Sequence, residues 1–216
     1  MPGHLPWRHT PGTNKAALQA ELALEVDPRI PLIGMVTRVD FQKGVDLVWP
    51  ALEGIGESPW QFVFVGTGDP KLEQLCQAHA EKLPQRVRVV LRFDPPLARR
   101  IYAGSDMLLI PSRYEPCGLA QMIAMRYGSV PVVRATGGLL DSVKDLKSPG
   151  GGTGFVFQDP SFESLQQAIG RALEYYKQPQ LWEQLQRNGM SQDFSWTQSA
   201  RDYEKLYRRI GDLHAA

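Results

Sequence analysis

Two basic residues lie where they could bind an anion. Arg38 and Lys43 are five positions apart and bracket the start of a segment with helical spacing. The first backbone N–H groups of a helix have no partners inside the helix, so they add partial positive charge to that of the two side chains. Both residues could instead be ordinary surface cations. Their position between an expected strand and an expected helix favours the anion site.

A glycine-containing turn follows the next expected strand. In Gly66-Thr67-Gly68 two positions lack a Cβ atom, so the backbone could approach a ligand closely or could simply make a tight turn. The third glycine of a dinucleotide-binding fingerprint would fall at Lys71. The sequence therefore argues against a dinucleotide site at this turn.

Two further loops combine polar residues with a helix start. The segment 111–119 places Glu115 and several polar groups directly before a helix, and the segment 134–141 has the pair Gly137-Gly138 at the start of another. Arg38 and Lys43 would lie at the same edge of the molecule. Two helix starts and two cations together indicate a diphosphate ligand.

The usual motifs for a bound metal or nucleotide hydrolysis are missing from the sequence. A Walker-type phosphate loop ends in Gly-Lys-Ser/Thr, and the sequence has no Gly-Lys pair. It also has no Asp-x-Asp pair, and its four histidines have no metal-ligand spacing. We therefore expect ligand binding and chemistry without a metal or a cofactor.

Short apolar runs that alternate with helical segments must position these loops. Strands are expected at 32–37, 61–66, 87–91, 106–110, 130–134 and 154–157, and helices between them at 44–52, 71–83, 97–103, 119–127 and 139–143. This alternation predicts an α/β fold with a doubly wound, six-stranded parallel sheet of the Rossmann-like type. The loops discussed above then meet at the carboxyl edge of the sheet, where such folds bind ligands.

The chain divides into three expected parts. Residues 1–28, interrupted by prolines, form a lead-in or linker segment with one amphipathic helix from Lys15 to Leu24. Residues 29–192 form the Rossmann-like domain. Residues 193–216 form a C-terminal helix with Ser195 as its candidate N-cap.

Composition limits the partners and the compartment. Lys plus Arg is 24 against 23 Asp plus Glu, and a net charge of +1 gives no reason to expect a nucleic-acid partner. No apolar run approaches the roughly 18 residues of a membrane span, and the first residues lack the apolar core of a secretory signal. Cys76 and Cys117 give neither a disulfide framework nor a zinc pattern. We expect the cytoplasm, or the plastid stroma if the source is a plant.

Several motifs carry a resemblance to a known family. The run 37–47, TRVDFQKGVDL, is similar to the Arg-x4-Lys segment of bacterial glycogen synthases and plant starch synthases. The segments 111–121, PSRYEPCGLAQ, and 134–143, RATGGLLDSV, resemble two further motifs of that family, and Phe194-Ser195-Trp196 follows in the same order. The resemblance covers residues 15–213.

The resemblance implies a retaining glycosyltransferase of the GT-B type, which moves glucose from ADP-glucose to the 4-hydroxyl of an α-1,4-glucan. This chain would be its C-terminal, donor-binding half. The family's N-terminal half carries a Lys-x-Gly-Gly loop and a catalytic-site histidine, and no Lys-x-Gly-Gly sequence occurs here. The chain alone is therefore expected to be inactive and to need that half as a partner.

Two alternatives stay open. One is a related GT-B enzyme that uses a UDP- or GDP-sugar, although the sequence Glu115-Pro116-Cys117-Gly118 speaks against it. The other is a nucleotide-sugar binding module without catalysis, since the motifs of only one half are present. The nucleotide that the chain binds would separate the first alternative from the main hypothesis.

The resemblance also implies roles for individual residues. Arg38 and Lys43 would bind the diphosphate and stabilise charge on it as the sugar leaves, and Glu115 would accept hydrogen bonds from glucose hydroxyls. These three residues are the catalytic candidates. The candidates for nucleotide or sugar binding are Gly66, Gly68, Phe93, Cys117, Gly118, Leu119, Ala120, Thr136, Gly137 and Gly138.

The resemblance implies a different contact for each group of binding candidates. Phe93 aligns with an aromatic residue near adenine, but it could equally be a core residue. The amides of Gly118, Leu119 and Ala120 would face phosphate or sugar, with Cys117 lining the site rather than acting as a nucleophile. Thr136, Gly137 and Gly138 would close over the glucose and the β-phosphate. Ile123 stands where the family's Glu-x7-Glu pattern has its second acid, so the ribose needs another contact.

Overall fold

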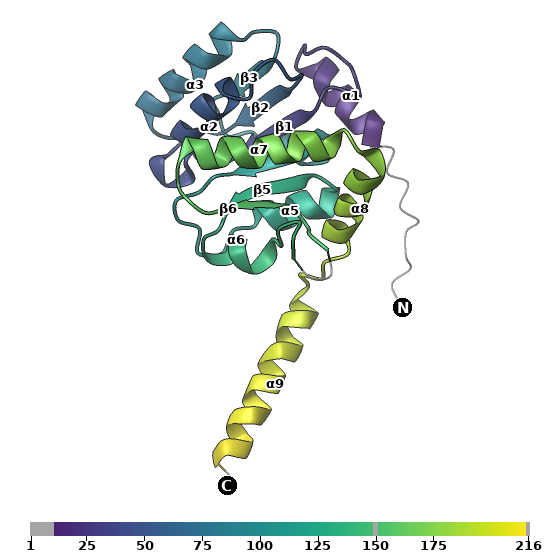
Figure 1. The fold of residues 1–216 in the computed structure, drawn as a ribbon. Coiled ribbons are helices and arrows are strands. Elements are labelled where there is room, and N and C mark those ends of the chain that lie inside the picture. The colour runs from purple at the N-terminus through teal and green to yellow at the C-terminus, as the bar shows by residue number, and fades with distance from the viewer. Residues whose placement is uncertain (1–10, 149–150, 215–216) are drawn as a thin grey trace.

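The computed structural model describes residues 11–148 and 151–214, and it contains one six-stranded sheet covered by helices (Figure 1). The strands are β1 (Leu32–Val36), β2 (Gln61–Val65), β3 (Val87–Val90), β4 (Met107–Ile110), β5 (Val130–Arg134) and β6 (Phe155–Phe157). The helices are α1 (Pro11–Glu21), the 3-10 helix η1 (Phe41–Lys43), α2 (Val45–Glu53), α3 (Pro70–Lys82), α4 (Pro95–Gly104), α5 (Ala120–Tyr127), α6 (Gly137–Ser142), α7 (Phe162–Tyr176), α8 (Pro179–Met190) and α9 (Trp196–His214).

All five strand pairings are parallel, and the strand order is β3-β2-β1-β4-β5-β6. This order confirms the expected α/β, doubly wound, Rossmann-like sheet, and each strand begins and ends within one residue of its expected bounds. The winding reverses between β1 and β4, whose register pairs Ile33 with Met107. A crevice opens at such a switch point because the loops after the two strands turn to opposite faces.

Alternate residues of each strand enter two separate cores, one on each face of the sheet. In β4, Met107 and Leu109 pack on the face covered by α2, α7 and α8, whereas Leu108 and Ile110 pack on the face covered by α1, α4 and α5. Burial on both faces explains why these strands are continuously apolar. The sheet is therefore a rigid support for the loops at its carboxyl edge.

Helix α1 is part of the packed body. It begins at Pro11, four residues earlier than expected, and ends at Glu21, three residues earlier than expected, and Leu18 is buried against α4. The Lys15 ammonium lies 2.7 Å from Asp106 Oδ2 and donates to the Tyr176 hydroxyl at 2.9 Å. The first ten residues of the expected lead-in segment lie outside the described residues, and the boundary at residue 28 stays a prediction.

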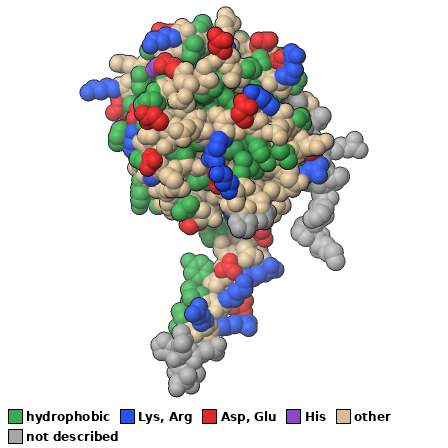
Figure 2. Space-filling view, viewed as in Figure 1, with side chains coloured by type: hydrophobic (Ala, Val, Ile, Leu, Met, Phe, Trp, Pro, Cys, Tyr) green, Lys and Arg blue, Asp and Glu red, His purple; other side chains and the backbone are tan. Residues whose placement is uncertain are grey.

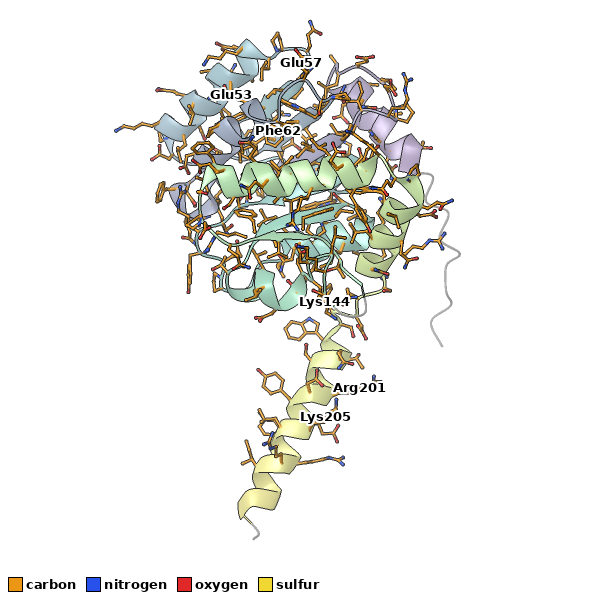
Figure 3. The ribbon with its side chains drawn as sticks, in the orientation of Figure 1. Glu53, Glu57, Phe62, Lys144, Arg201 and Lys205 are labelled. Atoms are coloured by element: carbon orange, nitrogen blue, oxygen red, sulfur yellow. The ribbon has the colours of Figure 1, made fainter. Side chains whose placement is uncertain are left out.

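Helix α9 projects away from the sheet (Figure 1). Ser195 caps it as expected, because the Ser195 hydroxyl oxygen accepts from Gln198 N at 3.3 Å. Apolar side chains follow one side of the helix, and Arg201 and Lys205 lie on the other (Figures 2 and 3). Trp196, the first residue of the helix, is 90% exposed. Within the described ranges, no helix is long and apolar enough to cross a membrane.

Candidate functional site

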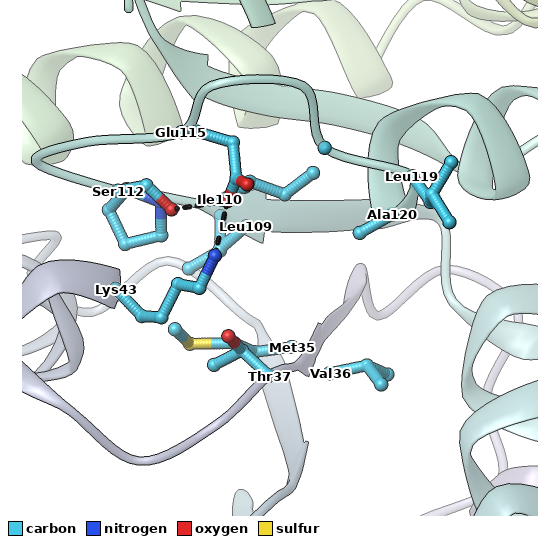
Figure 4. Close-up of a pocket in the computed structure, with 12 residues that line it drawn as sticks. Met35, Val36, Thr37, Lys43, Leu109, Ile110, Ser112, Glu115, Leu119 and Ala120 are labelled. Carbon is cyan, nitrogen blue, oxygen red and sulfur yellow. Dashed lines mark hydrogen bonds and ion pairs between the residues drawn. The ribbon is translucent and has the colours of Figure 1, made fainter. Parts of the chain in front are cut away.

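A cavity of about 140 Å³ opens between the carboxyl ends of β1 and β4 (Figure 4). It is lined by Met35, Val36, Thr37, Lys43, Leu109, Ile110, Pro111, Ser112, Glu115, Gly118, Leu119 and Ala120. This position is the switch point of the sheet, where doubly wound folds bind their ligands. We refer to it as the switch-point cavity.

An ion pair between two of the catalytic candidates lies in the switch-point cavity. Lys43 Nζ is 2.5 Å from Glu115 Oε2, and the Ser112 hydroxyl donates to the same oxygen at 3.2 Å (Figure 4). Both charged side chains are largely buried. A phosphate group that bound Lys43 would therefore share the ammonium with the Glu115 carboxylate.

Local structure fixes the position of Lys43. Asp40 caps η1, and its carboxylate accepts from Lys43 N at 2.8 Å. Gly44 ends η1 with φ +68°, and a Cβ at this position would overlap the carbonyl oxygen of Pro111. Only glycine lets the loop after β1 approach the loop after β4 this closely.

A second cavity of about 190 Å³ adjoins the first, since Val36 and Thr37 line both. Arg38 lines this second cavity and not the switch-point cavity; it is 70% exposed and lies 3.1 Å from Asp40 Oδ2. Arg38 and Lys43 thus line adjacent cavities, and their shared contact with one diphosphate stays a prediction. We refer to the second space as the Phe93 cavity.

Phe93 lies at the rim of this second cavity with 84% of its surface exposed. The alternative that Phe93 is a core residue is therefore wrong. Arg92 and Asp94, on either side of it, pair with each other at 2.7 Å. An aromatic face beside a shallow apolar cavity suits a flat ring such as a nucleotide base.

Arg113 braces the loop of Lys43 against the loop of Glu115. Its guanidinium donates to both carboxylate oxygens of Asp46, at 2.7 and 2.8 Å, and to the Phe41 carbonyl oxygen at 2.7 Å. Its backbone N–H donates to the Gln42 carbonyl oxygen, also at 2.7 Å. A two-point arginine–carboxylate contact has a fixed geometry, so the two loops are held in a fixed relation.

Arg134 supports the loop that carries Glu115 through contacts with the backbone of that loop. It donates to the carbonyl oxygens of Ser112 and Arg113, and burial lowers its pKa below the usual value, with Arg113 acting in the same direction. Nothing in the sequence pointed to these roles of Arg113, Asp46 and Arg134. Asp46 lies 67 positions from Arg113 along the chain, and Ser112 lies 22 positions from Arg134. The sequence shows that each motif contains a charged residue, but it does not show the partner of that residue.

Gly66 and Gly68 owe their glycine identity to chain packing. A Cβ at these positions would overlap the carbonyl oxygens of Thr37 and Val39, in the loop after β1. The Gly68 N–H already donates to Glu73 Oε1 at 2.7 Å. The tight approach of two loops thus accounts for both glycines, and a contact of either with a ligand stays a prediction.

The start of α5 borders the switch-point cavity. Gly118 has φ +72°, and Leu119 and Ala120 follow it in the cavity lining. The buried Gln121 amide donates to the carbonyl oxygens of Cys117 and Gly118, at 3.2 and 2.9 Å. The positive end of the helix therefore faces the cavity, whereas Cys117 is exposed beside it.

Thr136, Gly137 and Gly138 lie behind the Glu115 loop. The Gly138 N–H donates to the Glu115 carbonyl oxygen at 3.1 Å, and a Cβ at Gly137 would overlap that same oxygen. Among the described lining residues of the switch-point cavity, none of the three occurs. Their observed contact holds Glu115 in place, and closure over a sugar stays a prediction.

Metal ligands are not grouped in the part of the chain that the structure describes. There, no set of three or more His, Cys, Asp or Glu side chains could hold a metal ion. The charges nearest to the switch-point cavity are those of Lys43 and Glu115. Binding without a metal stays a prediction.

A doubly wound parallel sheet with a cavity at its switch point defines the class of α/β proteins whose ligands bind at the carboxyl edge. Residues 21–189 match the family model "Glycosyl transferases group 1". The match covers well over half of the chain, and the chain belongs to this family. The family includes proteins in which this domain is one half of a GT-B fold, and the observed sheet is that C-terminal half.

Among individual proteins, the chain is similar to glycogen synthases. The chain is 48% identical to a glycogen synthase of Moorella thermoacetica over 199 residues, which are 91% of this chain and 41% of that protein. It is 50% identical to a glycogen synthase of Syntrophotalea carbinolica over 205 residues, which are 94% of this chain and 42% of that protein. The resemblance to the C-terminal part of glycogen and starch synthases is confirmed, and the chain spans about two fifths of the length of these relatives.

A solved structure supports the same family assignment. The catalytic domain of Starch Synthase IV from Arabidopsis thaliana, bound to ADP and acarbose, superposes with a TM-score of 0.84 at 41% identity. The match covers 92% of this chain and 42% of that chain. The fold of this chain is thus the fold of one part of that domain.

Proposed function

We propose that this chain is the ADP-glucose-binding domain of a glycogen or starch synthase. The observation that carries the proposal is the Lys43–Glu115 pair at the switch point, beside a second cavity that has Phe93 at its rim. A nucleotide sugar offers a diphosphate to the ammonium, sugar hydroxyls to the carboxylate and a flat base to the aromatic ring. The likeness to glycogen synthases and to a starch synthase solved with ADP supports this ligand over other diphosphates.

The two cavities suggest how the donor would lie. The diphosphate would bind Lys43 and the start of α5, and the adenine would lie against Phe93, since the two cavities share Val36 and Thr37. Arg38, at the second cavity, would reach the diphosphate from the solvent side. The ribose would have to be held without a carboxylate at Ile123.

The reaction would transfer glucose with retention of configuration. The bond between the anomeric carbon and the diphosphate oxygen breaks, and the 4-hydroxyl oxygen of the glucan bonds to the anomeric carbon on the same face. Lys43 would stabilise the negative charge that develops on the departing diphosphate, and Glu115 would hold the sugar by hydrogen bonds. The hydroxyl proton would leave with the diphosphate.

One domain supplies only one wall of such a reaction site. A transfer of this kind needs the acceptor hydroxyl and the departing phosphate held together in a cleft closed to water. The relatives are more than twice as long as the match to this chain. We therefore propose that the acceptor is positioned with the help of an N-terminal half and that this chain alone transfers no glucose.

Isothermal titration calorimetry with ADP, UDP and GDP tests the ligand. We expect ADP to bind with a dissociation constant in the micromolar range, roughly 6 to 8 kcal/mol of binding free energy, and a chelator to leave it unchanged. Tighter binding of UDP or GDP would favour the alternative donor. Loss of binding in the chelator would contradict the metal-free site.

Incorporation of labelled glucose from ADP-glucose into glycogen tests the division of labour. The assay compares this chain alone with the same chain mixed with a separately made N-terminal half of a related glycogen synthase. We expect no transfer by the chain alone. Robust turnover without the second half would overturn the proposal that the acceptor side lies elsewhere.

A further inference from the structure

Two large aromatic side chains are exposed beside the Lys43–Glu115 pair. Phe41 is the first residue of η1, two positions before Lys43, and 63% of its surface is exposed. Tyr114 directly precedes Glu115 and is 60% exposed. We call these two side chains the aromatic lip.

Neighbouring residues hold the Phe41 ring and the backbone of Tyr114 in place. The Arg113 guanidinium carbon lies 3.6 Å from the centre of the Phe41 ring and covers one of its faces. The same guanidinium is fixed by Asp46 and by the Phe41 carbonyl oxygen, and Gln42 donates to the Tyr114 carbonyl oxygen at 3.1 Å. Contact with a ligand would thus require little further ordering of the backbone.

The aromatic lip and the Phe93 cavity lie at different places along the carboxyl edge of the sheet. The Phe93 cavity is formed by loops after β1, β2 and β3, whereas the Phe41–Arg113 contact joins the loops after β1 and β4. A donor that extends from Lys43 towards Phe93 leaves Phe41 and Tyr114 uncovered. Phe41 and Tyr114 line neither cavity, so their exposed rings would stay accessible to a second ligand.

The chemistry of the aromatic lip fits a neutral sugar. A pyranose ring presents C–H groups on its faces, and these pack against the electron-rich face of an aromatic ring. The positive charge of Arg113 is balanced by Asp46, so the lip adds no unpaired charge that would select an anion. The Tyr114 side chain combines an apolar ring with a hydroxyl that can bond a sugar hydroxyl.

We propose that Phe41, together with Tyr114, is a stacking site for a glucose unit of the α-1,4-glucan acceptor. This inference rests on the proposed function, because it takes the acceptor to be a glucan. It assigns to this chain a direct contact with the acceptor, in addition to its contact with the donor. Phe41 is then a binding residue for the acceptor and acts on no reacting atom.

Affinity electrophoresis of the whole chain through gels that contain glycogen tests the stacking site. We expect the wild-type chain to be retarded, and Phe41→Ala to weaken its affinity for glycogen by about five-fold or more, the loss typical of one aromatic contact. Phe41→Trp restores the retardation because it keeps a ring. Phe41→Leu does not, although it keeps an apolar side chain against Arg113.

Two controls separate stacking from damage to the fold. Phe194→Ala removes another exposed phenylalanine, 42% exposed and far along the chain, and should leave the retardation unchanged. Calorimetry with ADP on every variant should give the wild-type affinity. If Phe41→Ala does not fold, Phe41→Leu still tests whether a ring is needed. Its melting temperature can be compared directly with that of Phe41→Trp.

The outcomes distinguish this inference from the function on which it rests. A chain that binds ADP but is not retarded by glycogen, or whose retardation survives Phe41→Leu, overturns the stacking site and leaves the proposed function standing. A chain that binds neither ADP nor ADP-glucose overturns the proposed function itself. Equal retardation of Phe41→Leu and Phe41→Trp would show that no aromatic ring is needed at this position and would likewise overturn the stacking site.

Discussion

The ammonium nitrogen of Lys43 lies 2.5 Å from Glu115 Oε2, so the residue expected to bind phosphate is paired with the residue expected to bind sugar. The two residues are separated by 72 positions in the sequence. A donor whose phosphate and sugar enter together would exchange this one contact for two new ones. In the proposed function, the pair would therefore couple recognition of the diphosphate to recognition of the sugar.

Lys43→Ala should weaken ADP binding by roughly 10- to 150-fold, because a charge-assisted hydrogen bond contributes about 1.5 to 3 kcal/mol. The variant should also lose most of the preference for ADP over AMP, which lacks the second phosphate. Calorimetry with both nucleotides measures this. Equal affinities of the wild-type chain for AMP and ADP would contradict the assignment of Lys43.

Glu115→Gln should strengthen ADP binding roughly two- to five-fold, because it removes the carboxylate that competes with phosphate for Lys43. Glu57→Gln, at an exposed position away from the cavities, is the matched control (Figure 3). In a full-length enzyme Glu115→Gln should reduce glucose transfer. A large loss of ADP affinity would instead place Glu115 in contact with the nucleotide.

Arg113→Lys should lower the melting temperature by roughly 3 to 10 °C, since it removes the two-point contact with Asp46 and the bond to the Phe41 carbonyl oxygen. Arg187→Lys serves as the control, because the Arg187–Glu183 pair lies on an exposed helix face. Calorimetric melting of both variants measures the difference. Equal shifts would mean that Arg113 does not brace the two loops.

Lys15→Met should reduce the free energy of unfolding by about 3 to 5 kcal/mol, because it leaves Asp106 buried without its counter-charge. Burial raises the pKa of Asp106, and the Lys15 ammonium opposes that rise. The double variant Lys15→Met with Asp106→Asn should recover much of the loss. Urea unfolding of the two single variants and the double variant measures the coupling, and simple additivity would refute it.

The stability of the protein should fall as the pH drops below about 6.5, in part because of His79. Burial lowers the pKa of His79 below its usual 6.5, which outweighs the opposing effect of Glu53. The unfolded chain therefore takes up the His79 proton at a higher pH than the folded chain does, and stability that is present above pH 6.5 is lost towards the folded pKa.

His79→Gln tests this pH dependence. The variant removes the titrating group while keeping a polar side chain beside Trp49, on which the imidazole stacks at 4.9 Å. Urea unfolding between about pH 5.5 and about pH 7.5 should give a flatter profile for the variant than for the wild-type chain. Parallel profiles would exclude His79 as a source of the dependence.

The strands could be predicted because strands that are buried on both faces consist of continuous apolar residues, such as Leu109 and Ile110. Helix α8 was missed as a separate element because it buries only a few side chains, chiefly Trp182 and Leu185, among polar residues. The sequence did not indicate that Trp196 is exposed, because Trp196 begins a helix that leaves the body of the domain.

For the site, the sequence predicted which loops meet but not which side chains touch. Arg38 and Lys43 were expected at one edge of the sheet, and there they line two adjacent cavities, which the sequence did not indicate. The Lys43–Glu115 and Arg113–Asp46 pairs could not be foreseen, because each depends on the register of β1 beside β4. A charged residue in one motif does not indicate which residue of a distant motif it pairs with.

The loops at the carboxyl edge meet backbone to backbone, with a glycine of one facing a carbonyl oxygen of another. These contacts join Gly44 to Pro111, Gly66 to Thr37, Gly68 to Val39, Gly137 to Glu115 and Gly138 to Cys117. An engineered change of donor by grafting a single loop would leave such a contact without its counterpart. The transplantable unit of this domain is therefore the whole set of loops, exchanged together on an unchanged sheet.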